Sequence, residues 1–289
     1  MIPNNNLSVL PWYESIEQQN ARKWWVYNRV YPLFTPAGFV LPWQIITKHT
    51  GLTVDQVSVL YLYDANTGQQ IGASYIDSFR PMLYKKEFAV LGYDVWIFTG
   101  QLPVFPSMLN GRYYLLIRLD RLYYSEIFTV VNDIEPYLKI EWWDIDDFTM
   151  DAGTIVYTNP EFKNVLYLQA DIAKPEYPFE EEGETRDGYF FPIKQISEKR
   201  YRFNFLAPEY LLDVMRFIRM SDYAYITKNG QRYSLDTFLI TPEWEENGDV
   251  AAVEAVFDTA TVAKKIGRGY IDSVRGDFNN DFNNDFNNQ

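Results

Sequence analysis

Apolar and aromatic side chains recur at every second position in several segments of this chain, and this pattern constrains the fold more than any other feature. In the segment Arg112–Leu119, which follows the turn dipeptide Asn110–Gly111, every second residue from Tyr113 to Leu119 falls on one apolar face. The segment Tyr137–Trp143 repeats the pattern. A period of two is that of a β-strand, and an aromatic content of 18% suits pleated sheets. The sequence therefore predicts a mainly β fold.

The strands group into two β-sandwich or barrel-like units with one covering α-helix and extended N- and C-terminal arms. The helix is expected over about residues 208–221, where Pro208 suits the first turn and an apolar stripe follows. The stripe consists of Leu211, Leu212, Met215 and Ile218. The predicted regions are an N-terminal arm (1–48), a first β domain (49–132), a second β domain with the helix (133–270) and a low-complexity tail (271–289).

Local patterns predict further elements. Val57–Tyr63 and the turn residues Asp64–Gly68 indicate a hairpin, Tyr124–Val131 indicates one strand, and Glu14–Lys23 suits a short helix. The acidic run Pro178–Asp187 is expected to be a solvated loop, with binding of a basic partner as the alternative. The later strands are expected to show three faces: Tyr201, Phe203 and Phe205; Tyr233, Leu235, Thr237 and Leu239; and Ala251, Val253, Ala255 and Phe257.

Composition narrows the classes of function. The 26 Lys and Arg against 39 Asp and Glu give a formal charge of −13, so the chain as a whole repels nucleic-acid phosphates. The absence of cysteine excludes disulfides and thiolate metal ligands. No basic segment followed by an apolar core opens the sequence, and no apolar run approaches the roughly 18 residues of a spanning helix. We expect synthesis in the cytoplasm and no membrane partner.

The histidine and carboxylate residues of the chain do not form a recognisable catalytic pattern. His49 is the only histidine, and the sequence offers it no obvious partner, so it is expected to be an ordinary polar residue near a turn. Carboxylates beside Trp142–Trp143 resemble glycosidase or calcium sites only loosely, because Phe148 interrupts the calcium-loop spacing. These carboxylates are Glu141, Asp144, Asp146, Asp147 and Asp151. We expect no enzymatic activity, no metal and no cofactor.

The two ends of the chain carry unusual aromatic residues, which are the predicted partner-binding residues. In the N-terminal arm they are Trp12, Trp24, Trp25 and Trp43, and in the tail they are Phe278, Phe282 and Phe286. The N-terminal tryptophans fit either a strap across the chain's own core or an arm inserted into a neighbour. The tail holds three copies of the unit Asp-Phe-Asn-Asn. It is either a terminus without a role or three anchors that fill pockets on a neighbour by strand addition.

Three stretches resemble virion proteins of tailed bacteriophages that infect Bacteroidetes, including the crAss-like group. The first is LPWYESIEQQNARKWW with VYPLFTPAGFVLPWQI, within Leu10–Ile45. The second is NGRYYLLIRLDRLYYSEIFTV with YLKIEWWDIDD, within Asn110–Asp147. The third runs from KPEYPFEEEGETRDGYFFPIKQISEKRYRFNFLAPEY at Lys174–Tyr210 through KKIGRGY to the tail. None of these stretches is a catalytic signature.

The resemblance implies a structural component of a virion, in the tail or in the neck that connects it to the head. Its expected partners are copies of itself in a ring, other virion proteins and passing DNA without specific recognition. Heterologous contacts close such rings when the rotation allows. The alternative is a carbohydrate-binding β-sandwich module of a receptor-binding or tail-fibre apparatus, since exposed aromatic rings stack on sugars.

Overall fold

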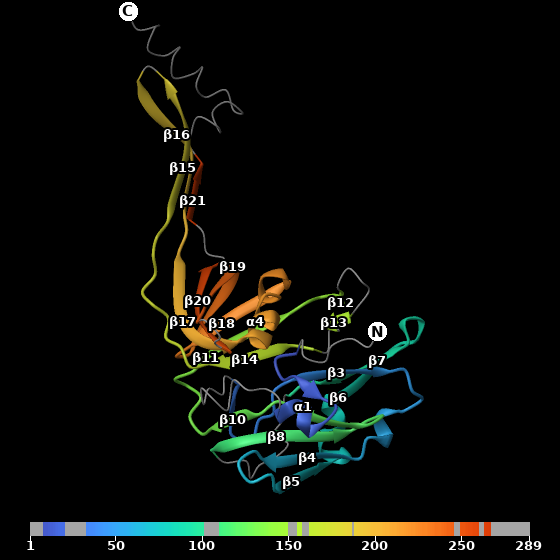
Figure 1. The fold of residues 1–289 in the computed structure, drawn as a ribbon. Coiled ribbons are helices and arrows are strands. Elements are labelled where there is room, and N and C mark those ends of the chain that lie inside the picture. The colour runs from blue at the N-terminus through green and yellow to red at the C-terminus, as the bar shows by residue number, and fades with distance from the viewer. Residues whose placement is uncertain are drawn as a thin grey trace, which may run out of the picture.

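The structure of this chain is a computed structural model that describes residues 8–20, 33–100, 110–149, 155–157, 162–186, 188–245, 249–259 and 263–266. It confirms a mainly β fold, in which the described strands form five sheets. Figure 1 shows a body of packed sheets from which one narrow β arm projects.

The largest sheet is built around one central strand. On one side β8 pairs with β4, which continues into the predicted hairpin with β5, and on the other side it pairs with β9 and β10. The short strands β1 and β2 complete the sheet on β9 and β10. Its strands are β1 Trp12–Tyr13, β2 Phe34–Pro36, β4 Val59–Asp64, β5 Gln70–Tyr75, β8 Gly111–Arg118, β9 Leu122–Ser125 and β10 Phe128–Val131.

The single strand expected over Tyr124–Val131 is wrong, because β9 and β10 are separate. Between them the Ser125 hydroxyl, not a backbone oxygen, accepts the hydrogen bond from the Leu115 amide at 2.8 Å. The next residue, Glu126, is fully buried, and its amide donates to the Pro11 carbonyl at 2.8 Å. The pairing with β8 is therefore interrupted where the N-terminal segment crosses.

In a three-stranded sheet, β3 and β7 are buried on both of their faces, which explains their nearly continuous apolar sequences, whereas most of the edge strand β6 is exposed or half-buried. In β7, Trp96 and Phe98 face the main core, whereas Val95 and Ile97 face a second cluster with Phe162. Its strands, in sheet order, are β3 Trp43–Lys48, β7 Tyr93–Phe98 and β6 Leu83–Phe88.

The six-stranded sheet confirms most of the later strand predictions. The predicted apolar faces of β17 and β20 are buried. In β19, however, the register shifts between Leu235 and Thr237, so Phe238 is buried and Leu239 is exposed. A bulge of this kind moves the following side chains to the opposite face, which corrects the prediction for Leu239. The strands in order are β14 Asn164–Leu168, β11 Leu138–Trp143, β18 Tyr223–Lys228, β19 Gln231–Trp244, β20 Val250–Thr259 and β17 Arg200–Pro208.

The predicted covering helix is present. Helix α4 follows Pro208, which is its N-cap residue, and Leu211, Leu212 and Met215 lie in the main core. A 3-10 turn extends it to Met220. The helices are α1 Ile16–Asn20, α3 Ile76–Phe79 and α4 Glu209–Met215, with 3-10 turns η2 Val54–Gln56, η3 Arg80–Met82, η4 Ala89–Leu91 and η5 Ile218–Met220. Two short strands, β12 Phe148–Thr149 and β13 Ile155–Tyr157, form a separate pair.

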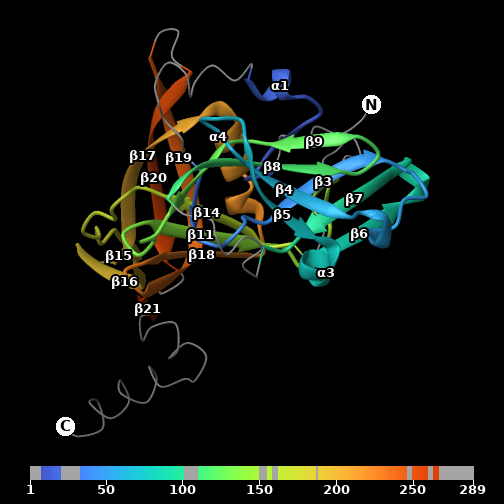
Figure 2. The ribbon, with the colours of Figure 1, turned by 90° about the horizontal axis from the view of Figure 1, so that it is seen from below.

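The remaining sheet forms the arm. Its strands are β15 Phe179–Arg186, β16 Tyr189–Ser197 and β21 Ala263–Ile266. In Figures 1 and 2 the arm leaves the body beside β17 and β20. The acidic run expected to be a solvated loop is thus a strand in a hairpin. Its residues Glu180, Glu181, Glu182 and Glu184 are exposed, and no other sheet formed by the described residues covers them.

One buried cluster runs through the body. It includes Leu60 and Leu115 of the first predicted β domain as well as Phe203 and Phe257 of the second. The predicted division between the domains therefore falls across a shared core. Within the described residues, no helix has the length and apolar character needed to cross a bilayer.

Two of the predicted partner-binding residues lie inside this core. Trp12 is 2% exposed and Trp43 is 0% exposed, and their ring centroids are 4.9 Å apart. Trp43 also stacks on Phe98 at 5.3 Å. The two indoles occupy the positions that the strap alternative requires, and contact with a neighbour would require them to leave the core. Trp24 and Trp25 lie outside the described residues.

A buried hydrogen bond fastens the N-terminal segment to the body. The Tyr13 hydroxyl donates to Glu126 Oε2 at 2.8 Å, and the Ile127 amide donates to Oε1 at 2.9 Å. Farther along the segment, Arg121 and Glu14 form an ion pair at 2.6 Å on the surface. The carboxylate of Glu126 thus loses one of its hydrogen-bond donors if the segment leaves the body.

Replacing Tyr13 with phenylalanine should lower the free energy of unfolding by about 1–3 kcal/mol, because a buried carboxylate loses a donor. Urea unfolding monitored by tryptophan fluorescence would measure the loss. Tyr75→Phe is the matched control, since Tyr75 is 65% exposed and should change stability little. Equal stability of the two variants would contradict the proposed anchoring.

Candidate interaction arm

The carboxylates beside Trp142–Trp143 do not converge on a shared site. Glu141 pairs with Lys139 at 2.7 Å, and Asp147 pairs with Lys86 at 2.6 Å. Asp144 instead accepts a hydrogen bond from the Asp222 amide at 3.1 Å. Asp151 lies outside the described residues. Among the described residues, no group of three or more His, Cys, Asp or Glu is arranged to hold a metal ion.

Burial raises the pKa of Asp144, and the neighbouring Asp222 charge acts in the same direction. Hydrogen bonds from the Asp222 amide and the Ser221 hydroxyl oppose this rise. The Asp222 carboxylate in turn accepts from the Ile145 amide at 2.7 Å. These reciprocal bonds hold two turns together, which is a structural arrangement.

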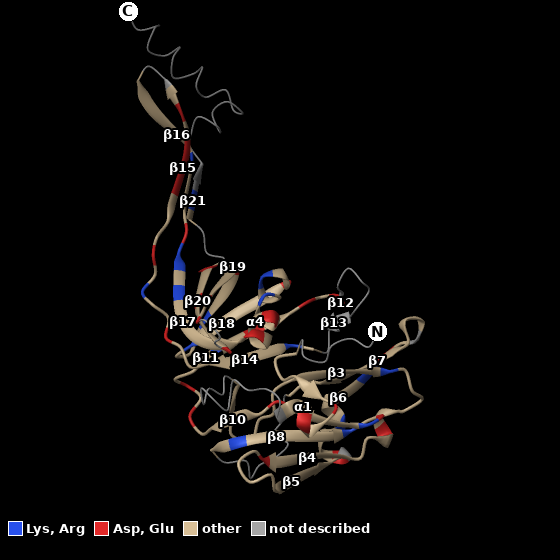
Figure 3. Cartoon of the chain, in the orientation of Figure 1, with Lys and Arg blue, Asp and Glu red and all other residues tan. Residues whose placement is uncertain are grey.

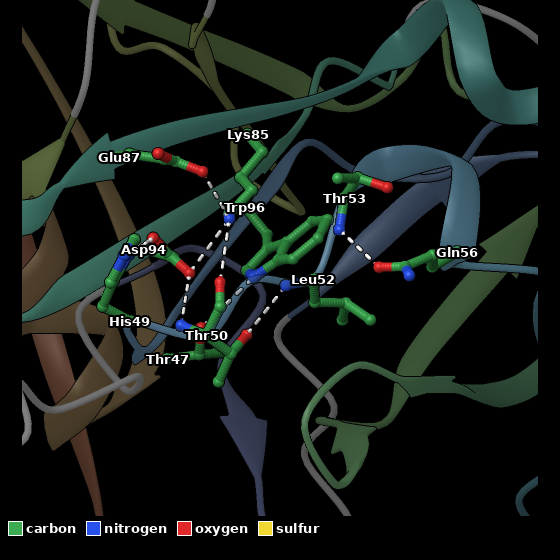
Figure 4. Close-up of polar contacts among 10 residues, drawn as sticks. All are labelled: Thr47, His49, Thr50, Leu52, Thr53, Gln56, Lys85, Glu87, Asp94 and Trp96. Atoms are coloured by element: carbon green, nitrogen blue, oxygen red, sulfur yellow. Dashed lines mark hydrogen bonds and ion pairs between the residues drawn. The ribbon is translucent and has the colours of Figure 1, made fainter.

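His49 has a partner that the sequence did not reveal. Its Nδ1 lies 2.7 Å from Oδ1 of the fully buried Asp94, and Lys85 Nζ lies 3.1 Å from Oδ2 (Figure 4). The Thr50 amide also donates to Oδ2 at 3.0 Å. Burial alone would raise the pKa of Asp94, but the bonds from Thr50, His49 and Lys85 outweigh it and lower the pKa.

This cluster resembles the orienting half of a catalytic triad, in which a carboxylate fixes an imidazole. Among the described residues, however, His49 makes no hydrogen bond to a serine or threonine hydroxyl. Asp94 is shared between His49 and Lys85, and Lys85 also pairs with Glu87 at 2.7 Å. These contacts connect the turn at Thr50 to the strands β6 and β7, which is a structural role.

In the described part of the chain, the projecting arm carries many side chains that do not pack in the core of the body. Nine residues of β16 at about 3.3 Å each give a length of about 30 Å. Its acidic residues, coloured red in Figure 3, lie along β15. They are Glu180, Glu181, Glu182 and Glu184, all exposed. Within the arm, Lys194 reaches Glu182 at 3.4 Å.

Large apolar side chains are also exposed along the arm and at its base. Tyr189 is 73% exposed and Phe191 is 52% exposed. The others are Tyr177, Phe179, Phe190 and Ile193. Monomeric proteins rarely leave contiguous apolar surface of this kind uncovered, so the arm has the character of a contact surface.

A glycine shapes the arm where its register shifts between Glu182 and Gly183. A Cβ atom at Gly183 would lie 2.3 Å from the Phe191 carbonyl oxygen and 2.6 Å from the Phe190 ring. The absence of a side chain there lets the Phe190 ring pack against the backbone of the opposite strand. The position of this aromatic ring therefore depends on Gly183.

Ion pairs fix the root of the arm to the body. Arg200 donates two hydrogen bonds to Asp258, at 2.8 and 3.1 Å, and the Glu176 and Arg200 backbones form an isolated bridge. Arg202 reaches Glu176 at 2.6 Å. The Arg200 hydrogen bond is the main cause that lowers the pKa of Asp258, against the opposing effect of burial.

An open groove lies on the six-stranded sheet, over β17, β19 and β20. It has a volume of about 500 Å³ and combines apolar with acidic lining. The lining residues include Leu206, Ala252, Glu243 and Glu254. The arm and the groove are exposed features that a partner could contact.

The sequence contains one local signal for the hairpin of the arm. Asp187–Gly188 is a dipeptide typical of two-residue hairpin turns, and Gly188 has a φ of 83°. The predicted partner-binding residues Phe278, Phe282 and Phe286 lie outside the described residues.

Comparison with protein-family models finds no family that matches the chain, and comparison with curated proteins finds no significant match.

Replacing Asp258 with asparagine should lower the free energy of unfolding at pH 7 by about 1–2 kcal/mol, because Arg200 loses a charged partner and is itself partly exposed. Since the folded-state pKa of Asp258 is lowered, its contribution is complete above the unfolded pKa of about 4 and is lost as pH falls through the folded value.

Urea unfolding of the wild-type chain and the Asp258→Asn variant between pH 7 and pH 3 would measure this contribution. The difference between them should shrink below about pH 4. Asp236→Asn, at an exposed position of β19, is the control and should show little difference at any pH. A constant Asp258→Asn effect down to pH 3 would contradict the assigned cause.

Proposed function

We propose that this chain is a non-enzymatic structural component of a tailed-bacteriophage virion, in the tail or neck, that assembles as a symmetric multimer. The observation that carries the proposal is the projecting arm, which exposes both aromatic and acidic side chains. A three-stranded sheet with no layer packed on either face cannot bury these rings itself. Contact with other chains would remove their apolar surface from water.

The proposal includes the finer architecture, in which two β-sandwich units form a scaffold and extended segments make the contacts. It also includes location in the virion after synthesis in the host cytoplasm. The resemblance of the N-terminal, central and arm segments to virion proteins supports this assignment. A formal charge of −13 would suit a component along which DNA passes, because repulsion prevents adhesion.

The ring contacts of the body favour assembly over the carbohydrate-binding alternative. Trp143 stacks with both Tyr223 and Tyr225 at 5.3 Å, on the outer side of the six-stranded sheet. Lys163 lies over the Trp143 ring at 4.6 Å, and Arg232 lies over the Tyr225 ring at 3.8 Å. A sugar platform needs free ring faces, whereas these faces contact one another and the two cations.

The double variant Tyr189→Ser/Phe191→Ser should keep the stability of the isolated chain and reduce its incorporation into particles of the phage that encodes it. Both side chains are exposed, and Phe190 keeps its place over Gly183. Thermal unfolding would check stability, and quantitative mass spectrometry of purified particles would measure incorporation.

The control is Tyr75→Ser, which removes an equally exposed ring from the body. Absence of the wild-type chain from purified particles would refute the virion assignment. Normal incorporation of the double variant would refute the role of the arm. Binding of the wild-type chain to a glycan array, abolished by Trp143→Ala, would instead support the carbohydrate-binding alternative.

A further inference from the structure

The arm has two edges, and each lacks a neighbouring strand within the described residues. Strand β16 is central and pairs with β15 on one side and β21 on the other. The outer backbone groups of β15 and β21 are therefore available for pairing. Natural proteins usually cover or block such edges, because they are templates for strand addition.

The two edges carry opposite charges. Strand β15 contains Glu180, Glu181, Glu182 and Glu184, whereas β21 contains Lys264 and Lys265. Charges at an edge normally prevent sheets from joining, since like edges repel each other. Two β15 edges would repel each other, and so would two β21 edges, whereas β15 of one copy attracts β21 of another. The charges therefore favour pairing of β15 with β21 between copies and oppose pairing of β15 with β15 or of β21 with β21.

The opposite charges also lie at the same height along the arm. Ile196 of β16 is paired with Glu180 on one side and with Lys264 on the other. Gln195 is likewise paired with Glu181 and occupies the register position opposite Lys265. A neighbouring arm placed without any shift along its length would therefore bring Glu180 beside Lys264.

The strand directions fit a rotationally symmetric assembly. Both β15 and β21 run antiparallel to β16, so they run parallel to each other. Around a rotation axis all arms point the same way, and β21 of one copy meets β15 of the next in parallel. An interface between two different surfaces of the same chain closes into a ring when the rotation allows.

Resting on the multimer of the proposed function, we propose that the partner of the arm is the arm of a second copy of this chain. Strand β21 of each copy adds in parallel to β15 of the next, with Lys264 opposite Glu180. In a closed ring the four residues of every β21 then pair with the first half of a neighbouring β15. The acidic run acts as a register signal in this arrangement, and the exposed aromatic side chains remain on the faces of the joined sheets.

Disulfide trapping tests the register, because the native chain contains no cysteine. In the variant Glu180→Cys/Lys264→Cys, the two positions within one arm are separated by β16, a gap of about 9–10 Å across two strand spacings. A disulfide requires Cα atoms closer than about 7 Å, so any disulfide must join two copies. Oxidation should produce a ladder of covalent multimers on non-reducing gels, for the free chain and within particles.

The matched control is Glu184→Cys/Lys264→Cys, which moves one thiol about 13 Å along the strand. It should give at most about one tenth of the ladder. Similar ladders from both variants would show random collision and would overturn the register. No ladder from the first variant, free or in particles, would overturn edge pairing, while incorporation of the wild-type chain into particles would leave the proposed function standing.

Charge reversal supplies a second test by a different readout. Glu180→Lys/Glu181→Lys makes the matched positions on both edges basic, and Lys264→Glu/Lys265→Glu makes them acidic on both edges. Each variant alone should associate at least ~10-fold more weakly than the wild type in sedimentation velocity at low salt. An equimolar mixture should regain association, because the basic edges of one variant meet the acidic edges of the other.

Circular dichroism should show the same β content for both variants, since the changed residues lie on the exposed arm. Failure of the mixture to regain association would overturn the pairing of β15 with β21. Association of either variant alone at the wild-type level would overturn it as well. Because these readouts concern contacts between copies, they are independent of whether the chain is found in particles.

Discussion

The body of this protein depends on burying aromatic rings that the N-terminal segment contributes. Trp12 belongs to the seven-stranded sheet and Trp43 to the three-stranded sheet, and their edge-to-face contact joins the two. Phe98 extends the stack within the three-stranded sheet. Rings of this size bury much apolar area each, so the segment acts as an interior part of the fold. The hydrogen bond from Tyr13 to Glu126 stabilises the fold only because the rings hold the N-terminal segment in place.

Where one face of a strand is buried and the register is regular, the alternation of the sequence predicted the fold. Strands β11, β17 and β20 follow their sequence patterns, and α4 buries the predicted stripe. The failures have a common cause in contacts between residues distant in the sequence. The break at Glu126 depends on Pro11, and the bulge in β19 depends on its register with β20. Neither contact leaves a local pattern that a period of two would reveal.

The arm escaped prediction for a different physical reason. A strand that packs against nothing on either face has no reason to alternate, so β15 reads as a charged loop. Only the turn dipeptide Asp187–Gly188 indicated a hairpin. The partner of His49 could not be predicted because Asp94 lies 45 residues away in the sequence. The pairing of β3 with β7 brings the two residues together. Candidate sites built from distant residues cannot be read from spacing alone.

The arm offers two kinds of contact at different places, backbone pairing along its edges and apolar contact on its faces. Its edges carry charge in register, which suits pairing with strands of identical arms, whereas its faces carry rings such as Tyr189 and Phe191, which suit apolar partners. Pairing the edges would leave the faces uncovered, since side chains in a sheet stand perpendicular to the direction of pairing. A ring of joined arms would therefore still expose the aromatic side chains of every copy. In the proposed assembly these side chains are where a different virion protein would bind, so one arm would both hold the copies together and contact the next component.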